Sequence, residues 1–329
     1  MNYNFDLPTD RRGTYSLKWD VAANELPMWV ADMDFETAPE IKEAIQKRAG
    51  HGVFGYTVVP EEWYRAIEDW WQVRHHFHME KEWMIFCTGV VPAISSIVRK
   101  MTTVGEKIVL LTPVYNIFFN SIVNNGRYVL ECPLRYENGE YSIDFCELEA
   151  KLADPQASMM IFCNPHNPVG KIWDRHTMEK IGHLRHKVWR GLNTDEAAEP
   201  NVFAMPAAIA AWRNGAPWLE ELRKYLYENK REAAEFLGTQ IPEVSLVSSE
   251  ATYLLWIDCR RITEKDVELK DFLRRETGLY LCEGSEYGKA GEGFLRMNAA
   301  CHMERLKDGL MRMKRGIEAF VCLPERRIQ

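Results

Sequence analysis

Apolar residues in the first half of the chain fall into short runs separated by longer helical stripes. The short runs, which are typical of buried strands, fall at 83–87, 107–111, 128–132 and 158–163. Helical patterns stand before and between these runs, at 38–49, 60–76, 91–102, 115–124 and 144–152. Strands that alternate with helices in this way predict a mostly parallel, doubly wound sheet.

The pattern changes after the fourth run. No strand pattern is visible between Asn164 and Glu243, a stretch with helical patterns at 174–187, 196–212 and 217–237. Strand patterns return at 244–248, 252–258 and 294–299, and helical stripes follow at 264–276 and 303–320. This second part predicts a smaller α+β domain. We therefore expect an N-terminal arm with part of the small domain at 1–45, a large domain at 46–240 and a C-terminal small domain at 241–329.

Composition and charge exclude several classes of protein. The chain has 329 residues, 46% of them hydrophobic and 27% charged, which is typical of a globular protein of two domains. A net charge of -7 without a cluster of basic residues argues against nucleic-acid binding. No apolar stretch is long enough to cross a membrane. Eight scattered cysteines without a C-x-x-C motif predict free thiols and a cytoplasmic protein.

The histidines do not predict a metal site. His75, His76 and His78 are close in sequence, but they end an amphipathic helical pattern, where histidine is favourable for electrostatic reasons. We therefore expect no bound metal.

The strongest candidate site is the segment Asn164-Pro165-His166-Asn167-Pro168-Val169-Gly170, directly after the fourth strand pattern. Two Asn-Pro steps closed by a glycine predict a sharp loop. In an open α/β sheet, ligands bind at the carboxyl ends of the strands, where this loop would lie.

This segment resembles the N-P-x-N-P-x-G motif of class I/II aminotransferases and related fold-type-I enzymes that use pyridoxal 5'-phosphate (PLP). The resemblance implies that Asn167 donates a hydrogen bond to the phenolic oxygen of PLP. It further implies a PLP-dependent transferase-like fold, with a large doubly wound domain and a smaller α+β domain.

Three further segments agree with this resemblance. Gly89, Val90 and Val91 join a strand pattern to a helical pattern, and a helix N-terminus can bind the PLP phosphate through backbone N–H groups. Tyr115 matches the aromatic residue that stacks on the pyridine ring. Tyr56 resembles a tyrosine that reaches the phosphate of the neighbouring subunit, which implies a homodimer.

Two residues are assigned to the substrate. Arg296 matches the arginine that holds the α-carboxylate, a task that suits a planar guanidinium with two parallel donors. The segment 27–35 resembles the N-terminal signature of cystathionine β-lyase-type C–S lyases, with Trp29 as a wall of the substrate entrance. The resemblance implies β-elimination on cystathionine or another cysteine conjugate, giving a thiol, pyruvate and ammonia.

Two groups of the family pattern are missing. The family has an aspartate that pairs with the pyridine nitrogen and a lysine that binds PLP covalently, both after the N-P-x-N-P-x-G loop. Neither pattern is found here, so we identify no catalytic residue. Lys171, Lys180 and Lys187 are the nearest lysines, and all three are typical of a protein surface.

The strand count points to the same gap. Four strand patterns before Asn167 do not complete the large sheet, and two missing βαβ units would amount to about 60 residues. We place the junction near Leu184 and Arg185. Either the polypeptide carries a deletion, or the sequence omits a stretch of it. Loss of central strands would expose their apolar neighbours, which favours the second explanation.

Two alternative functions stay open. An aminotransferase on the same fold would share the early steps of the reaction, and fold alone does not separate the two. A protein that kept the scaffold as a catalytically inactive binding or regulatory protein would account for the missing lysine.

Overall fold

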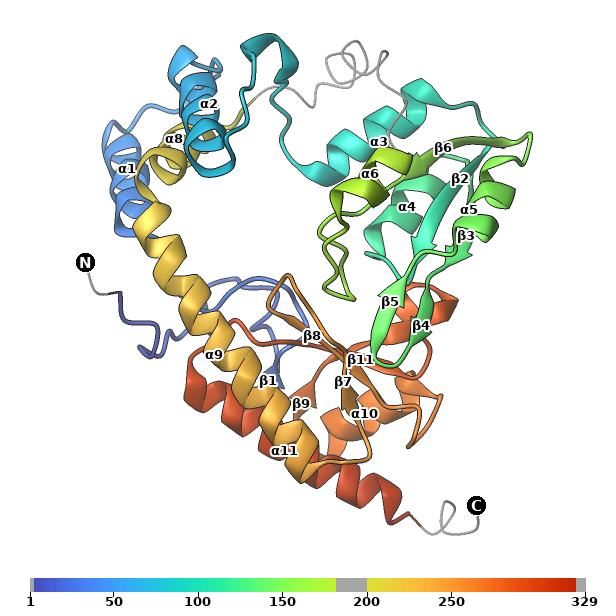
Figure 1. Ribbon diagram of the computed structural model, residues 1–329. Helices are drawn as coiled ribbons and strands as arrows, with labels where there is room; N and C mark the ends of the chain where they lie inside the picture. The colour runs from blue at the N-terminus through green and yellow to red at the C-terminus, as the bar shows by residue number, and fades with distance from the viewer. Residues whose placement is uncertain (1–2, 182–199, 324–329) are drawn as a thin grey trace.

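The computed structural model describes residues 3–181 and 200–323 (Figure 1). Its elements form three groups. Helices α1 (Pro39–Gly50), α2 (Glu61–His75) and α8 (Ala204–Asn214) pack together on one side. A parallel sheet with its helices lies on another side. The C-terminal sheet lies below both, along the long helix α9 (Ala216–Gln240).

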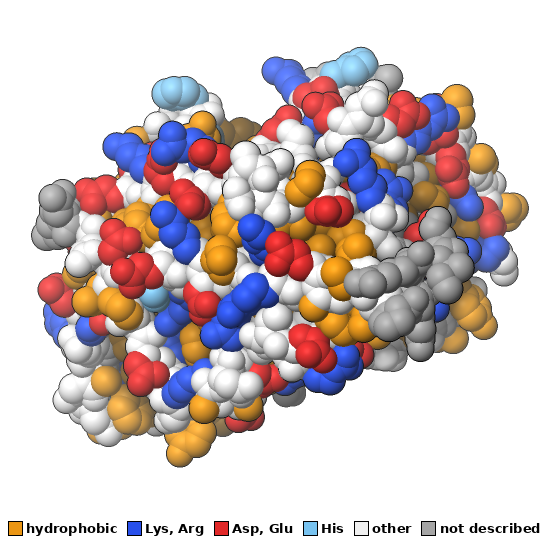
Figure 2. All heavy atoms as spheres, turned by 90° about the horizontal axis from the view of Figure 1, so that it is seen from below, with side chains coloured by type: hydrophobic (Ala, Val, Ile, Leu, Met, Phe, Trp, Pro, Cys, Tyr) orange, Lys and Arg blue, Asp and Glu red, His pale blue; other side chains and the backbone are white. Residues whose placement is uncertain are grey.

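Charges of both signs are distributed over the surface. On the face in Figure 2, lysine and arginine side chains are interspersed with aspartate and glutamate, without a broad basic patch. No helix among the described residues is long and apolar enough to span a membrane. The described part of the chain also contains no cluster of metal-binding side chains.

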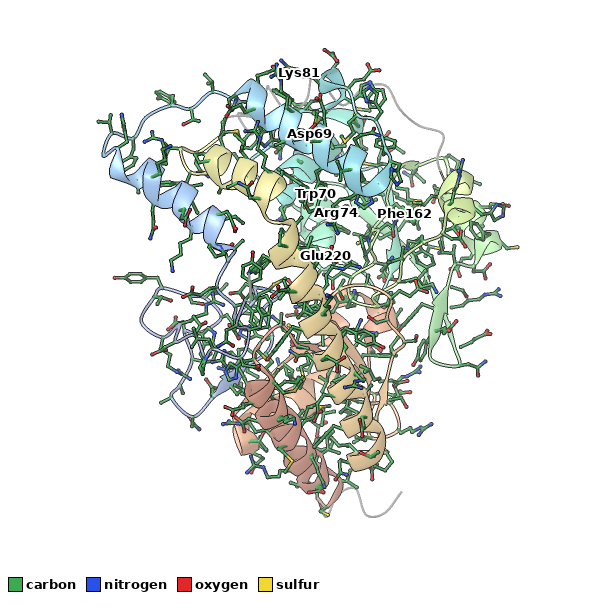
Figure 3. The ribbon with its side chains drawn as sticks, turned by 60° about the vertical axis from the view of Figure 1, so that its left-hand side comes forward. Asp69, Trp70, Arg74, Lys81, Phe162 and Glu220 are labelled. Carbon is green, nitrogen blue, oxygen red and sulfur yellow. The ribbon has the colours of Figure 1, made fainter. Side chains whose placement is uncertain are left out.

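Helices α2 and α9 are joined by a polar contact. Arg74 of α2 forms an ion pair with Glu220 of α9, and its guanidinium lies 4.7 Å from the centre of the Trp70 ring (Figure 3). Trp70 in turn packs edge-on against Trp212 of α8, with the ring centres 5.2 Å apart. These contacts fix the α1–α2–α8 group to the start of α9.

The parallel sheet has three strands in the order β3-β2-β6. Its strands are β2 (Lys107–Thr112), β3 (Tyr128–Pro133) and β6 (Ala157–Ile161). The helices that follow or precede them are α3 (Val90–Met101), α4 (Ile117–Val123), α5 (Phe145–Leu152) and α6 (Arg175–Ile181). Parallel strands with intervening helices confirm the predicted fold class.

Strand β2 shows why the sheet is doubly wound. Ile108 and Leu110 face a cluster that includes α3 and α4, whereas Val109 and Leu111 face the opposite cluster, which includes α5. All four side chains are almost completely buried. Alternate positions of one strand therefore meet helices on both faces, as a central parallel strand requires.

The predicted strand at 83–87 is wrong. The structure has a short 3-10 helix, η1 (Lys81–Trp83), followed by irregular backbone with half-buried side chains. A strand needs a hydrogen-bonded neighbour, and the described residues offer none beside this segment. The structure also has a hairpin of β4 (Arg135–Glu137) and β5 (Glu140–Ser142), joined at Asn138-Gly139, which was not predicted.

The C-terminal part contains a four-stranded antiparallel sheet in the order β10-β11-β8-β7. Its strands are β7 (Ser245–Leu246), β8 (Leu254–Asp258), β10 (Cys282–Glu283) and β11 (Phe294–Asn298). The connecting elements are α10 (Asp266–Thr277), β9 (Leu279–Tyr280), η2 (Gly284–Tyr287), η3 (Lys289–Gly291) and α11 (Met303–Val321). Strand β1 (Leu26–Pro27) of the N-terminal arm pairs with β9. Strand pairing therefore joins the N-terminal arm to the C-terminal part of the chain.

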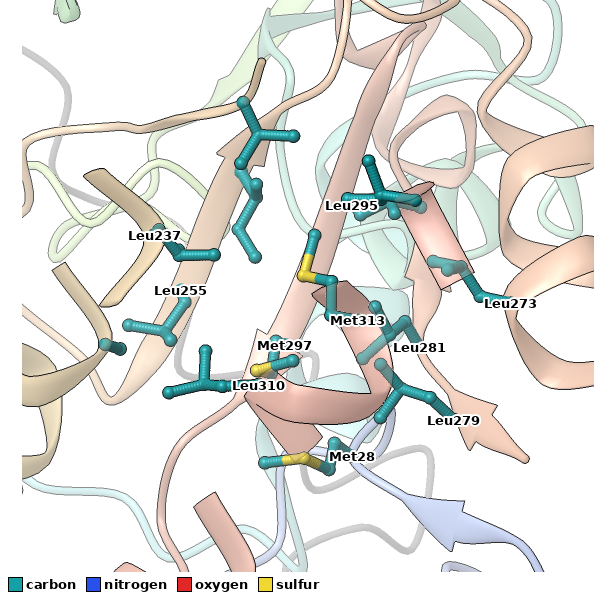
Figure 4. Close-up of a cluster of buried hydrophobic side chains, with 14 of the residues drawn as sticks. Met28, Leu237, Leu255, Leu273, Leu279, Leu281, Leu295, Met297, Leu310 and Met313 are labelled. Atoms are coloured by element: carbon teal, nitrogen blue, oxygen red, sulfur yellow. The ribbon is translucent and has the colours of Figure 1, made fainter. Parts of the chain in front are cut away.

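The main hydrophobic core lies beneath this sheet (Figure 4). Leu295 and Met297 of β11 pack there against Leu310 and Met313 of α11, and Met28 of the arm joins them. Alternation along β11 turns Phe294, Arg296 and Asn298 to the opposite face. Phe294 belongs to the second cluster, which it shares with residues of β2 and α5. Strand β11 therefore presents Arg296 on the face that meets the parallel sheet and its helices.

Candidate active site

The Asn164–Gly170 loop begins three residues after β6, at the carboxyl edge of the parallel sheet, as predicted. Gly170 has a φ of +71°, a conformation that favours glycine. A Cβ there would lie 2.4 Å from Oγ of Ser249. The backbone N–H groups of Glu250 and Ala251 both donate to the Gly170 carbonyl at 2.9 Å. The loop is therefore held against the C-terminal part of the chain.

Contacts link this loop to Tyr115 and Arg296. Nε2 of His166 lies 2.9 Å from the carbonyl oxygen of Pro113, two residues before Tyr115. The backbone N–H of Val114 donates to the carbonyl of Tyr287 at 2.9 Å. The guanidinium of Arg296 lies 5.0 Å from the Tyr287 ring centre. The structure thus brings the Asn167 loop, the Tyr115 loop and Arg296 into one connected region.

The side chains of Asn167 and Tyr115 are both half-buried, and that of Asn167 has an oxygen that is unpaired in the described structure. Asn167 is half-buried, and its side-chain oxygen is buried without a hydrogen-bond partner among the described residues. Tyr115 is also half-buried and packs edge-on against Phe118, with the ring centres 5.6 Å apart. A polar ligand in this region would satisfy the Asn167 amide, because buried polar groups are rarely left unpaired.

Arg296 is buried, with 5% of its surface exposed, yet no described carboxylate forms an ion pair with it. Its Nη2 donates to the carbonyl oxygen of Trp29 at 2.7 Å and lies 3.5 Å from Sγ of Cys282. Its Nε is buried without a partner. A buried cation without a counter-ion is costly, and an anionic ligand would relieve this cost.

Trp29 lies beside Arg296 in the N-terminal arm. Its ring stacks on Tyr280 with a centre-to-centre distance of 4.9 Å and an interplanar angle of 18°. Its indole Nε1 is buried without a partner. Arg274 lies over the far side of Tyr280, 3.8 Å from the ring centre. Trp29, the predicted wall of the substrate entrance, is therefore half-buried and held in place by its neighbours. It does not lie deep in the core.

The predicted phosphate site is the N-terminus of α3. Gly89 is its N-cap with an extended φ of 171°, and Val90 and Val91 begin the helix with exposed side chains. A Cβ at Gly89 would meet only Pro92 at ordinary contact distance. Nothing within the described chain therefore requires glycine here, and the backbone N–H groups of the first turn are open to a ligand.

No contact among the described residues holds the Tyr56 side chain in place. Its side chain is fully exposed, in a segment where Val53, Phe54 and Val58 are exposed as well. Two surface hollows of about 740 and 650 Å³ lie elsewhere, the first beside Phe5 and Tyr225, the second beside Tyr136 and Arg260. Neither hollow includes a residue predicted to bind cofactor or substrate.

The sequence matches the family described as "Aminotransferase class I and II" over residues 24–197 and 202–312. This match covers most of the chain. The chain belongs to the class I and II aminotransferase family.

Curated members of the family are similar over nearly their whole length. Cystathionine beta-lyase PatB of Bacillus subtilis is 35% identical, with 94% of this chain and 99% of the relative covered. Protein MalY of Escherichia coli is 29% identical, with 96% and 99% covered.

Solved structures of the family show the same fold. A PLP-bound putative aminotransferase from Clostridium difficile has a TM-score of 0.90 and 29% identity, with 96% of this chain and 100% of that chain covered. Cystalysin from Treponema denticola, which contains PLP, has a TM-score of 0.88 and 26% identity, with 97% and 100% covered.

The alignment with one relative is longer than the part of this chain that it covers. The alignment with the Bacillus subtilis relative spans 382 positions, whereas 94% of 329 residues is about 309. About 70 aligned positions therefore have no residue from this chain, close to the predicted 60 or so. The predicted junction at Leu184 and Arg185 lies outside the described residues.

No lysine described here resembles a substitute for the family lysine. Lys171 pairs with Glu250 at 3.5 Å at the surface. Lys187 and the side chain of Lys180 lie outside the described part. Sequence reasoning missed Lys230 of α9, whose Nζ donates to Ser249 Oγ at 2.8 Å and Ser249 O at 3.0 Å. Burial lowers the pKa of this amine, but its contacts are with the loop that holds Gly170 and are those of a structural residue.

Sequence reasoning also missed the surroundings of Arg296. Burial raises the pKa of the Cys282 thiol, and burial with the nearby Glu283 raises the pKa of Glu286. Burial likewise raises the pKa of Tyr287. These residues lie in β10 and η2, and no motif in the sequence marks them. The Cys282 thiol and the Tyr287 hydroxyl are therefore uncharged neighbours of the guanidinium, and neither is an anion that would neutralise its charge.

Proposed function

We propose that the described residues form the cofactor- and substrate-binding half of a PLP-dependent C–S β-lyase. Such a lyase converts a cysteine conjugate, such as cystathionine, and water into a thiol, pyruvate and ammonia. Bound PLP would supply an electron sink for charge that develops at the α-carbon. The observation that carries the proposal is Arg296, a buried guanidinium without an acidic partner in the described chain, linked through Tyr287 to the Tyr115 loop.

The residues present fit the non-covalent part of a PLP site. The side chain of Asn167 is half-buried, and its amide N–H group is the donor that suits the phenolic oxygen, whereas its unpaired amide oxygen can only accept. Tyr115 offers a half-exposed ring for stacking. Gly89, Val90 and Val91 offer open backbone N–H groups for the phosphate. Both the Bacillus subtilis relative and cystalysin support the assignment by their names.

The substrate would be held by Arg296 and Trp29. The free Nε–H of Arg296 and a terminal N–H can bind both oxygens of a carboxylate at once. The Trp29 ring, fixed by Tyr280, would form an apolar wall beside the carboxylate and exclude water from that side. Together they orient an amino acid and favour a substrate with an apolar or sulfur-containing side chain.

The covalent part does not fit. No described residue matches the family lysine or the aspartate that pairs with the ring nitrogen, so we assign proton transfer at the α-carbon to no residue. An intact mass equal to the 38.3 kDa of the printed sequence would establish that the polypeptide itself lacks this stretch. A mass greater by that of about 60 residues would show that the polypeptide contains the stretch in which the family lysine and aspartate are expected.

The proposal includes a cytoplasmic homodimer. Tyr56 is fully exposed within an apolar segment, as a residue that contacts a neighbouring subunit should be in a single chain. All eight cysteines are free, which fits a reducing compartment.

The direct test supplies the purified chain with PLP and L-cystathionine. We expect pyruvate and thiol in equal amounts without an added keto acid, at a lower rate than the Bacillus subtilis relative shows, because no lysine is assigned here. Pyruvate is measured with lactate dehydrogenase and thiol with a colorimetric reagent. Amino transfer that requires a keto acid would identify an aminotransferase instead. Binding without either product would identify a binding protein.

A further inference from the structure

His166 is a completely buried histidine between the two loops of the candidate site. None of its surface is exposed, and its ring contacts partners on both sides. Nε2 lies 2.9 Å from the carbonyl oxygen of Pro113, and the indole Nε1 of Trp173 donates to Nδ1 at 3.3 Å. Trp173 is itself 95% buried, with its ring nearly perpendicular to the imidazole. Both ring nitrogens are therefore engaged within the chain.

The two partners fix the tautomer of this imidazole. An indole N–H can only donate, so Nδ1 of His166 must accept and carries no proton. The carbonyl of Pro113 can only accept, so Nε2 carries the proton and donates it. A doubly protonated ring would place two donors opposite each other at Trp173. The neutral ring with its proton on Nε2 is thus the only form that satisfies both contacts.

The surroundings keep the ring neutral. Burial lowers the pKa of His166 to about 4, and the backbone carbonyls of Pro113 and Leu111 only partly oppose this effect. The ring consequently stays uncharged over the physiological range.

The contacts of His166 set the distance between two predicted cofactor-binding residues. His166 directly precedes Asn167, and Pro113 lies two residues before Tyr115. The His166 backbone is also fixed, because its N–H donates to Lys171 and its carbonyl accepts from Gly170, both at 2.7 Å. The Asn167 loop therefore cannot move relative to the Tyr115 loop without breaking a buried hydrogen bond.

We propose that His166 is a positioning residue that, with Trp173, holds Asn167 and Tyr115 at the separation needed by the pyridine ring of the cofactor. This inference rests on the proposed function. A histidine that only fills the core could satisfy its ring nitrogens with any nearby partners, whereas His166 pairs with the backbone of the Tyr115 loop and with the indole of Trp173. A buried hydrogen bond that bridges two loops costs free energy when either partner is removed, and the loops then relax.

Three substitutions separate the contacts. His166→Gln keeps a donor within reach of Pro113 but loses the acceptor for Trp173. Trp173→Phe keeps an aromatic ring and removes only the indole donor. His166→Leu removes both contacts and keeps an apolar side chain. His302→Gln is the matched control, since His302 is also buried but caps α11, away from both loops.

The first readout is the affinity of the full chain for PLP, measured by equilibrium dialysis. We expect about fivefold weaker binding for His166→Gln and Trp173→Phe, and a greater loss for His166→Leu. The control should bind as the unsubstituted chain does. Equal affinity in all variants, with only the thermal midpoint lowered, would show that His166 is merely structural and would overturn the inference.

The second readout needs no cofactor. Hydrogen–deuterium exchange of peptides covering 112–115 and 164–170 should become faster in His166→Leu and stay closer to the unsubstituted chain in His166→Gln. Unchanged exchange in both peptides would also overturn the inference. If the unsubstituted chain binds no PLP, the proposed function fails and the positioning role fails with it. If it binds PLP and the variants bind equally, only the positioning role fails.

Discussion

Arg296 donates to the carbonyl oxygen of Trp29 at 2.7 Å, so that β11 and the N-terminal arm meet at one buried guanidinium. Asn298, two residues further along β11, donates to the carbonyls of Val30 at 2.6 Å and Asp32 at 2.9 Å. The arm is thus fixed along the face of β11 that presents Arg296. Packing of the arm therefore depends on the same guanidinium that we propose for substrate binding.

We expect Arg296→Lys to weaken binding of L-cystathionine, in the presence of PLP, by about tenfold or more. A lysine offers a point charge and cannot replace the two parallel donors of a guanidinium. Isothermal titration calorimetry measures the effect. Arg275→Lys is the control, because Arg275 is exposed on α10, where it pairs with Glu276 and lies over the Phe272 ring. Equal affinities in both variants would remove Arg296 from the substrate site.

The arm also depends on a buried carboxylate. Asp34 is 98% buried and lies within 3.0 Å of Lys18, Arg11 and Arg305, and it accepts from Trp19 at 2.9 Å. Asp34→Asn should lower the free energy of unfolding by about 3–5 kcal/mol, because it leaves buried Lys18 without its counter-charge. Chemical denaturation measures this loss. A loss of unfolding free energy below about 1 kcal/mol would mean that the ion pairs of Asp34 contribute little to stability.

The pH dependence follows from the same carboxylate. Burial alone would raise the pKa of Asp34, but Lys18, Trp19 and Arg305 outweigh burial and hold the pKa below its usual value. The stabilisation is therefore complete above the unfolded pKa of about 3.9 and is lost as the pH falls through the lower folded value. Asp34→Asn should flatten the acid limb of a plot of unfolding free energy against pH. An unchanged acid limb would contradict the assignment.

The Asn167 loop should be sensitive at its closing glycine. Gly170→Ala combines a positive φ with a Cβ that meets Ser249, and we expect a loss of about 2–4 kcal/mol in the free energy of unfolding. Gly139→Ala has a similar φ of +83° but open space around its Cβ, so about 1 kcal/mol is expected. The free energies of unfolding of the two variants are measured by thermal or chemical denaturation. Their difference separates the effect of the contact with Ser249 from the effect of backbone strain. Equal losses would mean that the contact with Ser249 is easily relaxed.

Tyr56 tests the proposed contact between subunits. Tyr56→Ala should weaken PLP binding by about three- to tenfold without a change in the thermal midpoint, because a lost hydrogen bond to the partner's phosphate costs affinity and not folding. Tyr15→Ala is the matched control, since Tyr15 is equally exposed. Equilibrium dialysis and sedimentation velocity follow binding and association. A monomer, or equal effects of both substitutions, would contradict the role of Tyr56.

Periodicity predicted the elements that pack within one region of the chain. Helix α11 was predicted at 303–320 and spans Met303–Val321. The prediction succeeded because the spacing of Leu306, Leu310 and Met313 marks the single face that the helix buries. The run at 83–87 was apolar enough for a strand, but a strand also needs a neighbour, which local sequence does not reveal. Family membership and the Asn167 loop were predicted because the motif is contiguous.

The remaining features depend on contacts between distant residues. His166 meets Pro113 across 53 positions, and Arg296 meets Trp29 across 267. Their hydrogen bonds, and the absence of an acidic partner for Arg296 in the described structure, follow from packing and leave no local pattern. In the sequence, Lys230 is typical of a lysine on a charged helix face. Its contact with Ser249 follows only from the packing of α9.

Equilibrium dialysis of the full chain against PLP measures whether the chain carries a site for a phosphorylated pyridine. We expect saturable binding of one PLP per chain, weakened by competing inorganic phosphate and by Asn167→Ala. Binding that does not saturate, or that Asn167→Ala and phosphate leave unchanged, would show that the chain has no such site.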